Sequence, residues 1–187
     1  MPYDWFHEMS DDDALAVARY LKSLAPVRNA VRQNPNIWFK LGKMFLLHPA
    51  PAATIATQMP AATPQYGGYL SQHVGLCAEC HTPRTGLRDA PDKSRLFAGM
   101  TNPPKDFPQK PSNITPDATG IAQWSEADFI QTIRSGIDPG GVHLHPFMPW
   151  HQNRRMSDDE LRAIYRFLRT VPPIHNVVTR KPVPAGQ

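Results

Sequence analysis

The sequence predicts an all-α domain with long proline-rich loops, and three observations support this fold class. Segments with helical periodicity begin at capping residues and end at glycine or proline. The 21 prolines gather between these segments, where they interrupt regular structure. Both cysteines of the chain, Cys77 and Cys80, are followed at once by His81, a pattern typical of attachment of a large prosthetic group. Such a group would supply the apolar centre around which short helices and loops pack.

The segment from Cys77 to His81 has the C-x-x-C-H pattern of c-type haem attachment. Each thiol can bond one haem vinyl group as a thioether, and the adjacent imidazole can ligate the iron. Paired cysteines also occur in zinc sites and in thioredoxin-like redox pairs. A zinc site would need two more nearby ligands, and the chain has no further cysteine. A redox pair is expected beside a βαβ pattern, and none is evident in the sequence. The sequence therefore predicts one covalent haem c.

Residues 1–29 repeat residues 148–176 at a constant shift of 147 positions, with 11 identities and no gap. Such self-similarity indicates a duplicated structural unit, of which the first copy contains only the end. We therefore expect four regions: a C-terminal remnant of a preceding domain (1–29), a linker with a short amphipathic helix over 37–47 (30–60), a complete domain (61–176) and a tail (177–187).

The expected helices follow from caps and apolar spacing. Ser10 with Asp13, and Ser157 with Glu160, have the form of a capping box, so both copies of the repeat should contain a helix. The face predicted to be buried in the second copy comprises Leu161, Ile164, Tyr165 and Leu168.

Two further helices are expected around the cysteine motif. Residues 66–80 should form one helix leading into it, with Tyr66, Leu70, Val74 and Cys77 on a shared face. Residues 125–135 should form another, which Ser125 and Asp128 cap and Gly136 ends. Its buried side chains should be Phe129, Ile130 and Ile133.

The second axial ligand is expected in the loop over residues 140–150, which contains His143, His145 and Met148. Met148 is favoured because Pro146 and Pro149 stiffen the backbone around it, and because both copies of the repeat carry Met-Pro-aromatic at the same distance from the last helix. A histidine–methionine pair raises the potential of the iron and leaves no open position for a substrate. The two histidines remain the alternative ligands.

Three side chains near the motif have a predicted local role. The Nδ1 of His81 should donate a hydrogen bond to the carbonyl of Pro83 or of a neighbour. Arg84 should either neutralise a haem propionate or lie in solvent. Trp124 should either contact the haem edge or belong to the core.

The formal charge of +4 lies near the C-terminus, where residues 150–187 carry seven basic and three acidic side chains. This stretch is either a solvated helix face with internal pairing or a docking face for an acidic partner or anionic lipid. No nucleic-acid-binding motif accompanies the charge, so nucleic acid is not expected as a partner. A signal peptide and a membrane span are not visible, although c-type haem is attached outside the cytoplasm.

Several motifs together are more specific than C-x-x-C-H. They are Gly68-Tyr69-Leu70, C-A-E-C-H-T-P-R from Cys77, P-S-N-I-T-P-D from Pro111, Thr119-Gly120, Trp124-Ser125, Met148-Pro149-Trp150 and the helix that starts with Ser157-Asp158-Asp159-Glu160. In this combination the chain resembles the multi-haem cytochrome c subunits of membrane-bound alcohol, aldehyde and gluconate-type dehydrogenases. The resemblance implies a class I cytochrome c-like helical domain around one haem, preceded by the terminal helix of a truncated cytochrome c domain.

By position, the resemblance implies that Cys77 and Cys80 form the thioethers and that His81 and Met148 are the axial ligands. Met1 matches the axial methionine of a preceding domain, whose C-x-x-C-H is missing. An N-terminally truncated chain would account for the missing signal sequence.

The resemblance also implies a function and a location. The chain would relay electrons from a dehydrogenase catalytic subunit, a quinoprotein or a flavoprotein, to quinone or a terminal oxidase of the respiratory chain. It would work in a membrane-associated complex at the periplasmic side of the inner membrane, without being catalytic alone. The alternative is a haem enzyme or gas-binding domain in which His81 is the one strong axial ligand.

Overall fold

The computed structural model describes residues 3–30, 55–86, 89–105 and 107–179. The chain divides into two compact units, one formed by Met1–Phe6 with Gln58–Gln187 and the other by His7–Thr57. We call them unit 1 and unit 2 and describe each by itself. The short helix predicted over residues 37–47 lies outside the described residues.

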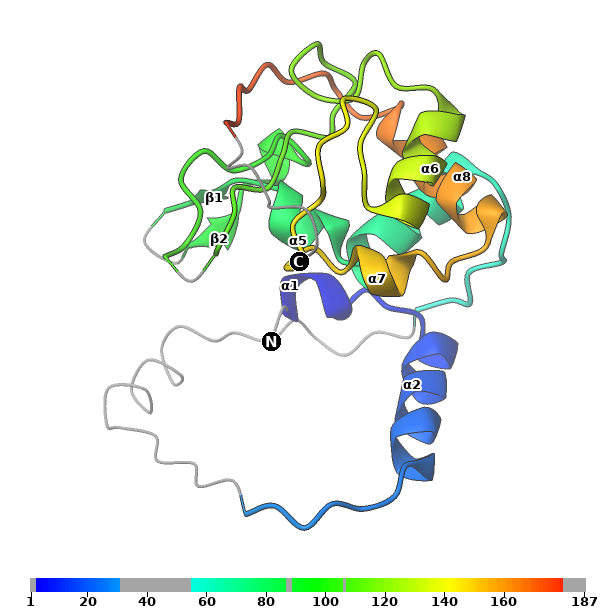
Figure 1. Ribbon diagram of the computed structural model, residues 1–187. Coiled ribbons are helices and arrows are strands. Elements are labelled where there is room, and N and C mark those ends of the chain that lie inside the picture. The colour runs from blue at the N-terminus through cyan, green and yellow to red at the C-terminus, as the bar shows by residue number, and fades with distance from the viewer. Residues whose placement is uncertain (1–2, 31–54, 87–88, 106, 180–187) are drawn as a thin grey trace. The chain divides into compact units, whose positions relative to one another are not determined.

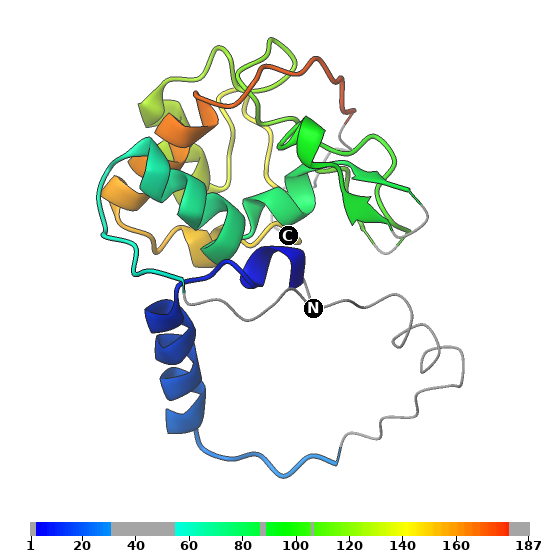
Figure 2. The ribbon, with the colours of Figure 1, turned by 180° about the vertical axis from the view of Figure 1, so that it is seen from behind.

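Unit 1 is mainly helical, as the sequence predicts (Figures 1 and 2). Its helices are α1 (Tyr3–Phe6), α4 (Pro64–Tyr69), π-helix η1 (Leu70–Val74), α5 (Cys77–His81), the 3₁₀ helix η2 (Lys93–Arg95), α6 (Glu126–Ser135), α7 (Trp150–Asn153) and α8 (Asp158–Leu168). A small hairpin of β1 (Arg84–Thr85) and β2 (Ala90–Pro91) lies on the side of this unit away from α6 and α8 in both views. None of the described helices is long and apolar enough to cross a membrane.

Helix α8 crosses α4 at a close approach of the two backbones. A Cβ atom added at Gly67 would lie 1.8 Å from the carbonyl oxygen of Ala163, so the crossing requires glycine at this position. Leu161, Ile164 and Leu168 of α8 are buried as predicted, whereas the tyrosine of the predicted face is half-buried. Full burial of each of these aliphatic side chains stabilises the fold by about 1.5–3 kcal/mol.

Helix α6 has the predicted caps at both ends. The Ser125 hydroxyl accepts a hydrogen bond from the Asp128 N–H at 3.1 Å, and the Asp128 carboxylate accepts from the Ser125 N–H at 2.9 Å. Gly136 ends the helix in the left-handed conformation, with φ of 72°, and the indole of Trp150 packs directly over it. Phe129 and Ile133 are buried, while Ile130 is half-buried.

The single helix predicted over residues 66–80 is wrong. After α4 the backbone widens into η1, in which the Gly75 N–H donates to the Leu70 carbonyl at 2.6 Å. Leu76 then takes the left-handed conformation, with φ of 53°, and α5 starts separately at Cys77. Because a π turn holds one residue more than an α turn, it rotates Val74 off the predicted buried face and leaves it 39% exposed.

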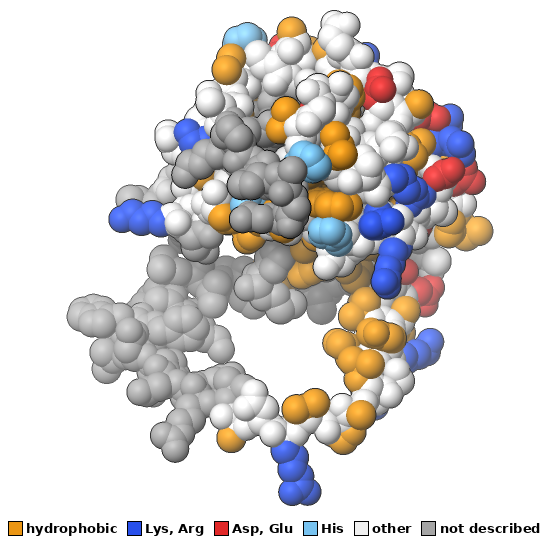
Figure 3. All heavy atoms as spheres, in the orientation of Figure 1, with side chains coloured by type: hydrophobic (Ala, Val, Ile, Leu, Met, Phe, Trp, Pro, Cys, Tyr) orange, Lys and Arg blue, Asp and Glu red, His pale blue; other side chains and the backbone are white. Residues whose placement is uncertain are grey.

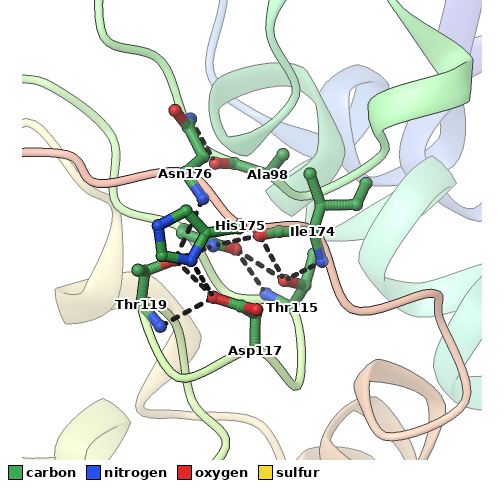
Figure 4. A network of polar contacts seen from close by, with 8 residues as sticks. Ala98, Thr115, Asp117, Thr119, Ile174, His175 and Asn176 are labelled. Atoms are coloured by element: carbon green, nitrogen blue, oxygen red, sulfur yellow. Dashed lines mark hydrogen bonds and ion pairs between the residues drawn. The ribbon is translucent and has the colours of Figure 1, made fainter.

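The segment after α8 is joined by hydrogen bonds to the loop that contains the P-S-N-I-T-P-D motif (Figure 4). The amide nitrogen of Asn113 donates to the Ile174 carbonyl at 2.8 Å and to the Thr119 hydroxyl at 2.9 Å. The amide nitrogen of Asn176 donates to the Ala98 carbonyl at 2.7 Å. These bonds hold the motif loop in place on one side of the cysteine helix.

Unit 2 contains α2 (Asp11–Ser23), which begins after Ser10 as predicted. The Ser10 hydroxyl accepts a hydrogen bond from the Asp13 N–H at 3.2 Å, and no residue of the helix is buried. The shift of 147 that relates the two halves of the sequence repeat also relates α1 to α7 and the start of α2 to that of α8. The repeat is therefore also a repeat of helical structure.

Candidate functional site

Helix α5 holds Cys77, Cys80 and His81 within little more than one turn. Neither cysteine is in a disulfide. Burial raises the pKa of the Cys77 thiol to about 12, and the neighbouring Cys80 adds to this shift. Burial, with the adjacent Glu79 carboxylate, also raises the pKa of the Cys80 thiol. A thioredoxin-like pair needs a lowered thiol pKa, so these two thiols do not have the character of a redox pair.

His81 is buried at the end of α5, with one ring nitrogen already engaged. Its Nδ1 lies 2.7 Å from the carbonyl oxygen of Ser112, to which it donates in the corresponding tautomer. The prediction of Pro83 or a neighbour as the partner is therefore wrong, because the acceptor comes from the P-S-N-I-T-P-D loop. Burial lowers the pKa of His81, which keeps the ring neutral and suited to metal ligation. Nε2 is the nitrogen left for a metal.

The backbone around His81 is fixed by the segment after the hairpin. The His81 carbonyl accepts a hydrogen bond from the Gly99 N–H at 2.7 Å, and the buried Thr82 hydroxyl accepts from the Phe97 N–H at 3.2 Å. Both contacts hold the end of α5 against a buried part of the chain. Contacts of this kind, outside the metal-ligand bonds themselves, help to orient a metal-binding ring.

A cavity of about 720 Å³ lies beside α5, and its lining brings together Cys77, Cys80, His81 and Met148. Its walls are largely apolar, with side chains from α6, α8 and the loop before α6: Ile114, Ile121, Trp124, Phe129, Ile133, Leu161, Ile164 and Leu168. An apolar cavity with a neutral histidine and two half-buried thiols in its lining matches the chemistry that the predicted haem c requires.

The loop between α6 and α7 also contributes to the cavity wall. Met148 is half-buried and packs against the hydrophobic core, and His143 and His145 also line the cavity. The Nδ1 of His145 accepts a hydrogen bond from the Phe147 N–H at 3.0 Å, so this ring is oriented by its own loop. All three candidate ligands of this loop thus face the same cavity.

Other methionines differ in their relation to this cavity. Met156 lines it and lies near Gly75, where an added Cβ would meet its methyl carbon at 3.4 Å. Met100 is buried and is not among the lining residues. Trp124 lines the cavity and packs on the core, as the second of its two predicted roles requires, while contact with a haem edge stays a prediction.

Part of the polar lining comes from residues to which the sequence analysis gives no individual role. Gln109, Lys110 and Asn113 line the cavity, and all three are in or directly before the P-S-N-I-T-P-D motif. Arg84 is bonded to the Glu79 carboxylate and is mostly buried, so it does not lie free in solvent, and its pairing with a haem propionate stays a prediction. The sequence signal that could have identified Lys110 as a lining residue is its place directly before the P-S-N-I-T-P-D motif.

The rim of the cavity carries exposed apolar side chains. Ile137, Val142 and Phe147 are between 36% and 48% exposed, and Phe147 makes an edge contact with Phe107 at 5.1 Å between ring centres. Figure 3 shows hydrophobic and histidine side chains close together on this face, with basic side chains at one edge. Within the described residues, no cluster of three or more histidine, cysteine or acidic side chains is placed to hold a metal ion.

The basic side chains of α8 are engaged within unit 1. Arg162 and Arg166 both pair with Glu126 at 3.2 Å, and Arg169 donates to the Ala122 carbonyl at 3.1 Å. From α6, Arg134 pairs with Asp158 at 2.7 Å. These contacts agree with the interpretation of internal pairing for this part of the charged stretch.

Comparison with known proteins identifies relatives that cover most of the chain. The "Diheme cytochrome c-type" protein of Cereibacter sphaeroides is 30% identical over 182 residues, which are 92% of this chain and 58% of that protein. The cytochrome c subunit of the quinone alcohol dehydrogenase of Gluconobacter oxydans is 30% identical over 190 residues, 93% of this chain and 39% of that subunit. The cytochrome c subunit of the gluconate 2-dehydrogenase of Pantoea cypripedii is 27% identical, over 91% of this chain and 42% of that subunit.

The chain therefore spans well under two thirds of the length of these relatives, between 39% and 58% of each. No family model matches the chain. Most of these homologues are, by name, cytochrome c subunits of dehydrogenases, in agreement with the resemblance found in the sequence.

Proposed function

We propose that this homologue of dehydrogenase cytochrome c subunits carries one haem c, attached through Cys77 and Cys80, and transfers electrons. His81 and Met148 are the proposed axial ligands. One observation carries the proposal: the same apolar cavity of about 720 Å³ is lined by all four of these side chains. When bound, haem c supplies a one-electron couple between ferric and ferrous iron.

The residues around the cavity have distinct roles in this proposal. The Ser112 carbonyl orients His81 and fixes its tautomer, which leaves Nε2 for the iron. When haem c is bound, the Met148 thioether would favour the ferrous state and the apolar walls would exclude water, and both effects would raise the reduction potential. Lys110 is the candidate to bind a haem carboxylate, because it is a cationic residue of the cavity lining.

The ligand assignment is tested on the chain produced with haem-attachment machinery. A pyridine haemochrome spectrum reports covalent haem, and an iron–thioether charge-transfer band reports methionine ligation. We expect both in the unaltered protein, loss of the band alone in Met148→Ala, and retention of the band in His143→Ala and His145→Ala. A band that survives in Met148→Ala would overturn the assignment of this methionine.

The second candidate function is a haem enzyme or gas-binding domain with His81 as its one strong ligand. The observation that favours this second function is the presence of His143 and His145 in the cavity lining. Carbon monoxide binding separates the two functions. A six-coordinate electron carrier binds it slowly and with loss of the methionine band, whereas a five-coordinate iron binds it at once.

We further propose a dehydrogenase catalytic subunit, quinoprotein or flavoprotein, as the electron donor, with quinone or a terminal oxidase as the acceptor. The names of the relatives support a dehydrogenase partner, and the apolar rim of Ile137, Val142 and Phe147 supplies a surface for it. The complex is proposed to lie at the periplasmic side of the inner membrane. Co-purification of a catalytic subunit from solubilised membranes would support this arrangement, and recovery of the chain without any partner would contradict it.

Residues 1–29 are proposed to be the end of a second cytochrome c unit, and residues 61–176 a complete one. The matching positions of α1 with α7 and of α2 with α8 support this division. Replacing residues 157–176 by residues 10–29 in the full chain tests it. We expect the chimera to retain covalent haem and the methionine band, whereas a scrambled version of the graft should lose the band.

A further inference from the structure

Helix α1 contacts the cysteine helix α5 through Trp5. The Trp5 side chain is 1% exposed, and its indole Nε1 donates to the Glu79 carboxylate at 2.7 Å. Glu79 lies between the two cysteines, and its other oxygen accepts a hydrogen bond from the Arg84 guanidinium. One carboxylate therefore connects α1, α5 and β1.

Two further elements contact the same residue of α1. The Nδ1 of His73 in η1 lies 2.8 Å from the Trp5 carbonyl oxygen. The Lys93 ammonium of η2 lies 5.6 Å from the centre of the Trp5 ring, within the range of a cation–π contact. A helix of four residues is thus held by three separate elements around the cysteine motif. This arrangement has the features of an anchor residue in an interface.

The repeat shows that the helix itself does not need this tryptophan. Trp5 corresponds to Gln152 in α7, which is exposed to solvent. The same position of the same helix is therefore polar where it faces water and aromatic where it contacts α5. The tryptophan belongs to the contact between α1 and α5, not to the fold of the repeat.

We propose that α1 is the docking element by which a preceding cytochrome c unit joins the haem-attachment helix α5, with Trp5 as the positioning residue. The proposal rests on the haem c function proposed above and on the assignment of residues 1–29. Helix α7 begins two residues after Met148, and α1 begins two residues after Met1, which itself lies outside the described residues. In sequence, α1 therefore follows the methionine of the first repeat copy as α7 follows Met148.

The junction between α1 and α5 would serve electron transfer between the preceding unit and the haem proposed at Cys77 and Cys80. That transfer would oxidise the donor and reduce the acceptor by one electron, and no atom or proton would change place. The path tested below passes through α1 and the cysteine helix α5.

Fluorine NMR of the haem-loaded chain with 5-fluorotryptophan tests the docking. Trp5→Phe identifies the Trp5 resonance by its disappearance. We expect this resonance to move between the ferric and ferrous states, because a docked Trp5 lies near a paramagnetic iron. Glu79→Gln should reduce this movement, and Gln152→Ala should leave it unchanged. A Trp5 resonance that is indifferent to both oxidation state and Glu79→Gln would overturn the docking.

Electron injection from a photosensitiser tests the path. A ruthenium label on Tyr3→Cys in α1 stands in for the preceding haem, and flash photolysis measures the rate at which the haem is reduced. We expect Trp5→Ala to lower this rate about tenfold or more, since truncation of a buried tryptophan anchor releases its helix. The same label on Gln152→Cys in α7 is the matched control, and its rate should not respond to Trp5→Ala.

Equal rates with and without Trp5 would overturn the proposal. The haemochrome spectrum and the methionine band, recorded for each variant, separate this failure from that of the proposed function. If both signals are absent from the unaltered chain, the proposed haem c function is itself contradicted. If both are present and Trp5→Ala leaves the rate unchanged, only the docking role of α1 is contradicted.

Discussion

Helices α8 and α2 have closely similar sequences but different surroundings. Both begin within a Met-Ser-Asp-Asp segment, directly after its serine cap, and both carry apolar side chains at the same relative positions. In α8 these positions are buried against α4, and Leu168 is 1% exposed. The corresponding Leu21 of α2 is 59% exposed, and Ala16 occupies the position of the fully buried Ala163.

The difference between α8 and α2 shows which properties of a helix its own sequence determines and which depend on packing against another element. Caps and spacing are enough to set where each helix starts and which face is apolar. Burial of that face needs a partner such as α4, with a glycine at the crossing point. Because most helical stability in proteins comes from packing, α2 should be a far weaker helix than α8. Matched substitutions in the two helices test whether burial against α4 is what makes α8 the more stable helix.

The largest difference is expected for the leucine at the end of each helix. Leu168→Ala should lower the free energy of unfolding of unit 1, the haem unit of our proposal, by about 2–5 kcal/mol, because it opens a cavity in the core. Leu21→Ala should change it by less than about 0.5 kcal/mol, as for an exposed position. Denaturant unfolding followed by haem absorbance measures both. Equal effects would show that α2 packs on the haem unit after all.

The alanine at the crossing point should give the next largest effect. Ala163→Leu forces a larger side chain into the contact with Gly67 and should cost about 1–3 kcal/mol of unfolding free energy. Ala16→Leu, at the corresponding place in α2, should be within about 0.5 kcal/mol of no change. Thermal unfolding of the two variants provides the measurement. A stable Ala163→Leu protein would mean that the two helices separate easily.

The two serine caps should have equal local effects that are seen in different observables. Replacing Ser157 or Ser10 by alanine removes a side-chain acceptor for an N–H of the first turn, which costs about 1 kcal/mol of helix stability. For Ser157 the loss should appear in the unfolding of the whole haem unit. For Ser10 it should appear only as faster amide exchange within α2. A global effect of Ser10→Ala would contradict the independence of α2.

The smallest effect concerns the charge at the start of α8. The hydrogen bond from Arg134 lowers the pKa of Asp158 below its ordinary value. A carboxyl with a lowered folded-state pKa stabilises the fold above its ordinary pKa of about 4, and the contribution disappears as the pH falls through the folded-state value. Asp158→Asn should therefore lower the midpoint of thermal unfolding slightly at neutral pH and not in strong acid.

Asp11→Asn in α2 is the matched control for this substitution, because Asp11 holds the same place in the repeat. It should leave the midpoint of the haem unit unchanged at both pH values. A loss for Asp158→Asn that persists in strong acid would show that the charge is not its cause.

Much of the helical fold could be predicted from the sequence, because its signals are local. The caps at Ser125 and Ser157 need only the residue three positions on, and the left-handed Gly136 follows its helix directly. The π turn and the left-handed Leu76 could not be predicted, since Leu70 to Leu76 carries no glycine or proline before Gly75. An apolar run with helical spacing fits an α turn and a π turn equally well.

The site could be predicted where residues are adjacent in the chain and not where they meet across it. The cysteines and His81 form one motif, and Met148 follows from the repeat, so the ligand set remains a prediction from sequence. The acceptor for His81 is 31 residues away at Ser112, and the partner of Glu79 is 74 residues away at Trp5. Contacts over such distances depend on tertiary packing, which a single sequence does not reveal.

The crossing of α4 and α8 has a consequence for the order in which the chain acquires its structure. The two helices are separated by most of unit 1, so their contact closes a long loop, and closing that loop costs chain entropy. Until Gly67 meets Ala163, the cavity has no complete wall and the cysteine motif stays accessible to an enzyme. We therefore expect haem to be attached to a loosely folded chain, with α8 docking afterwards as the step that seals it in.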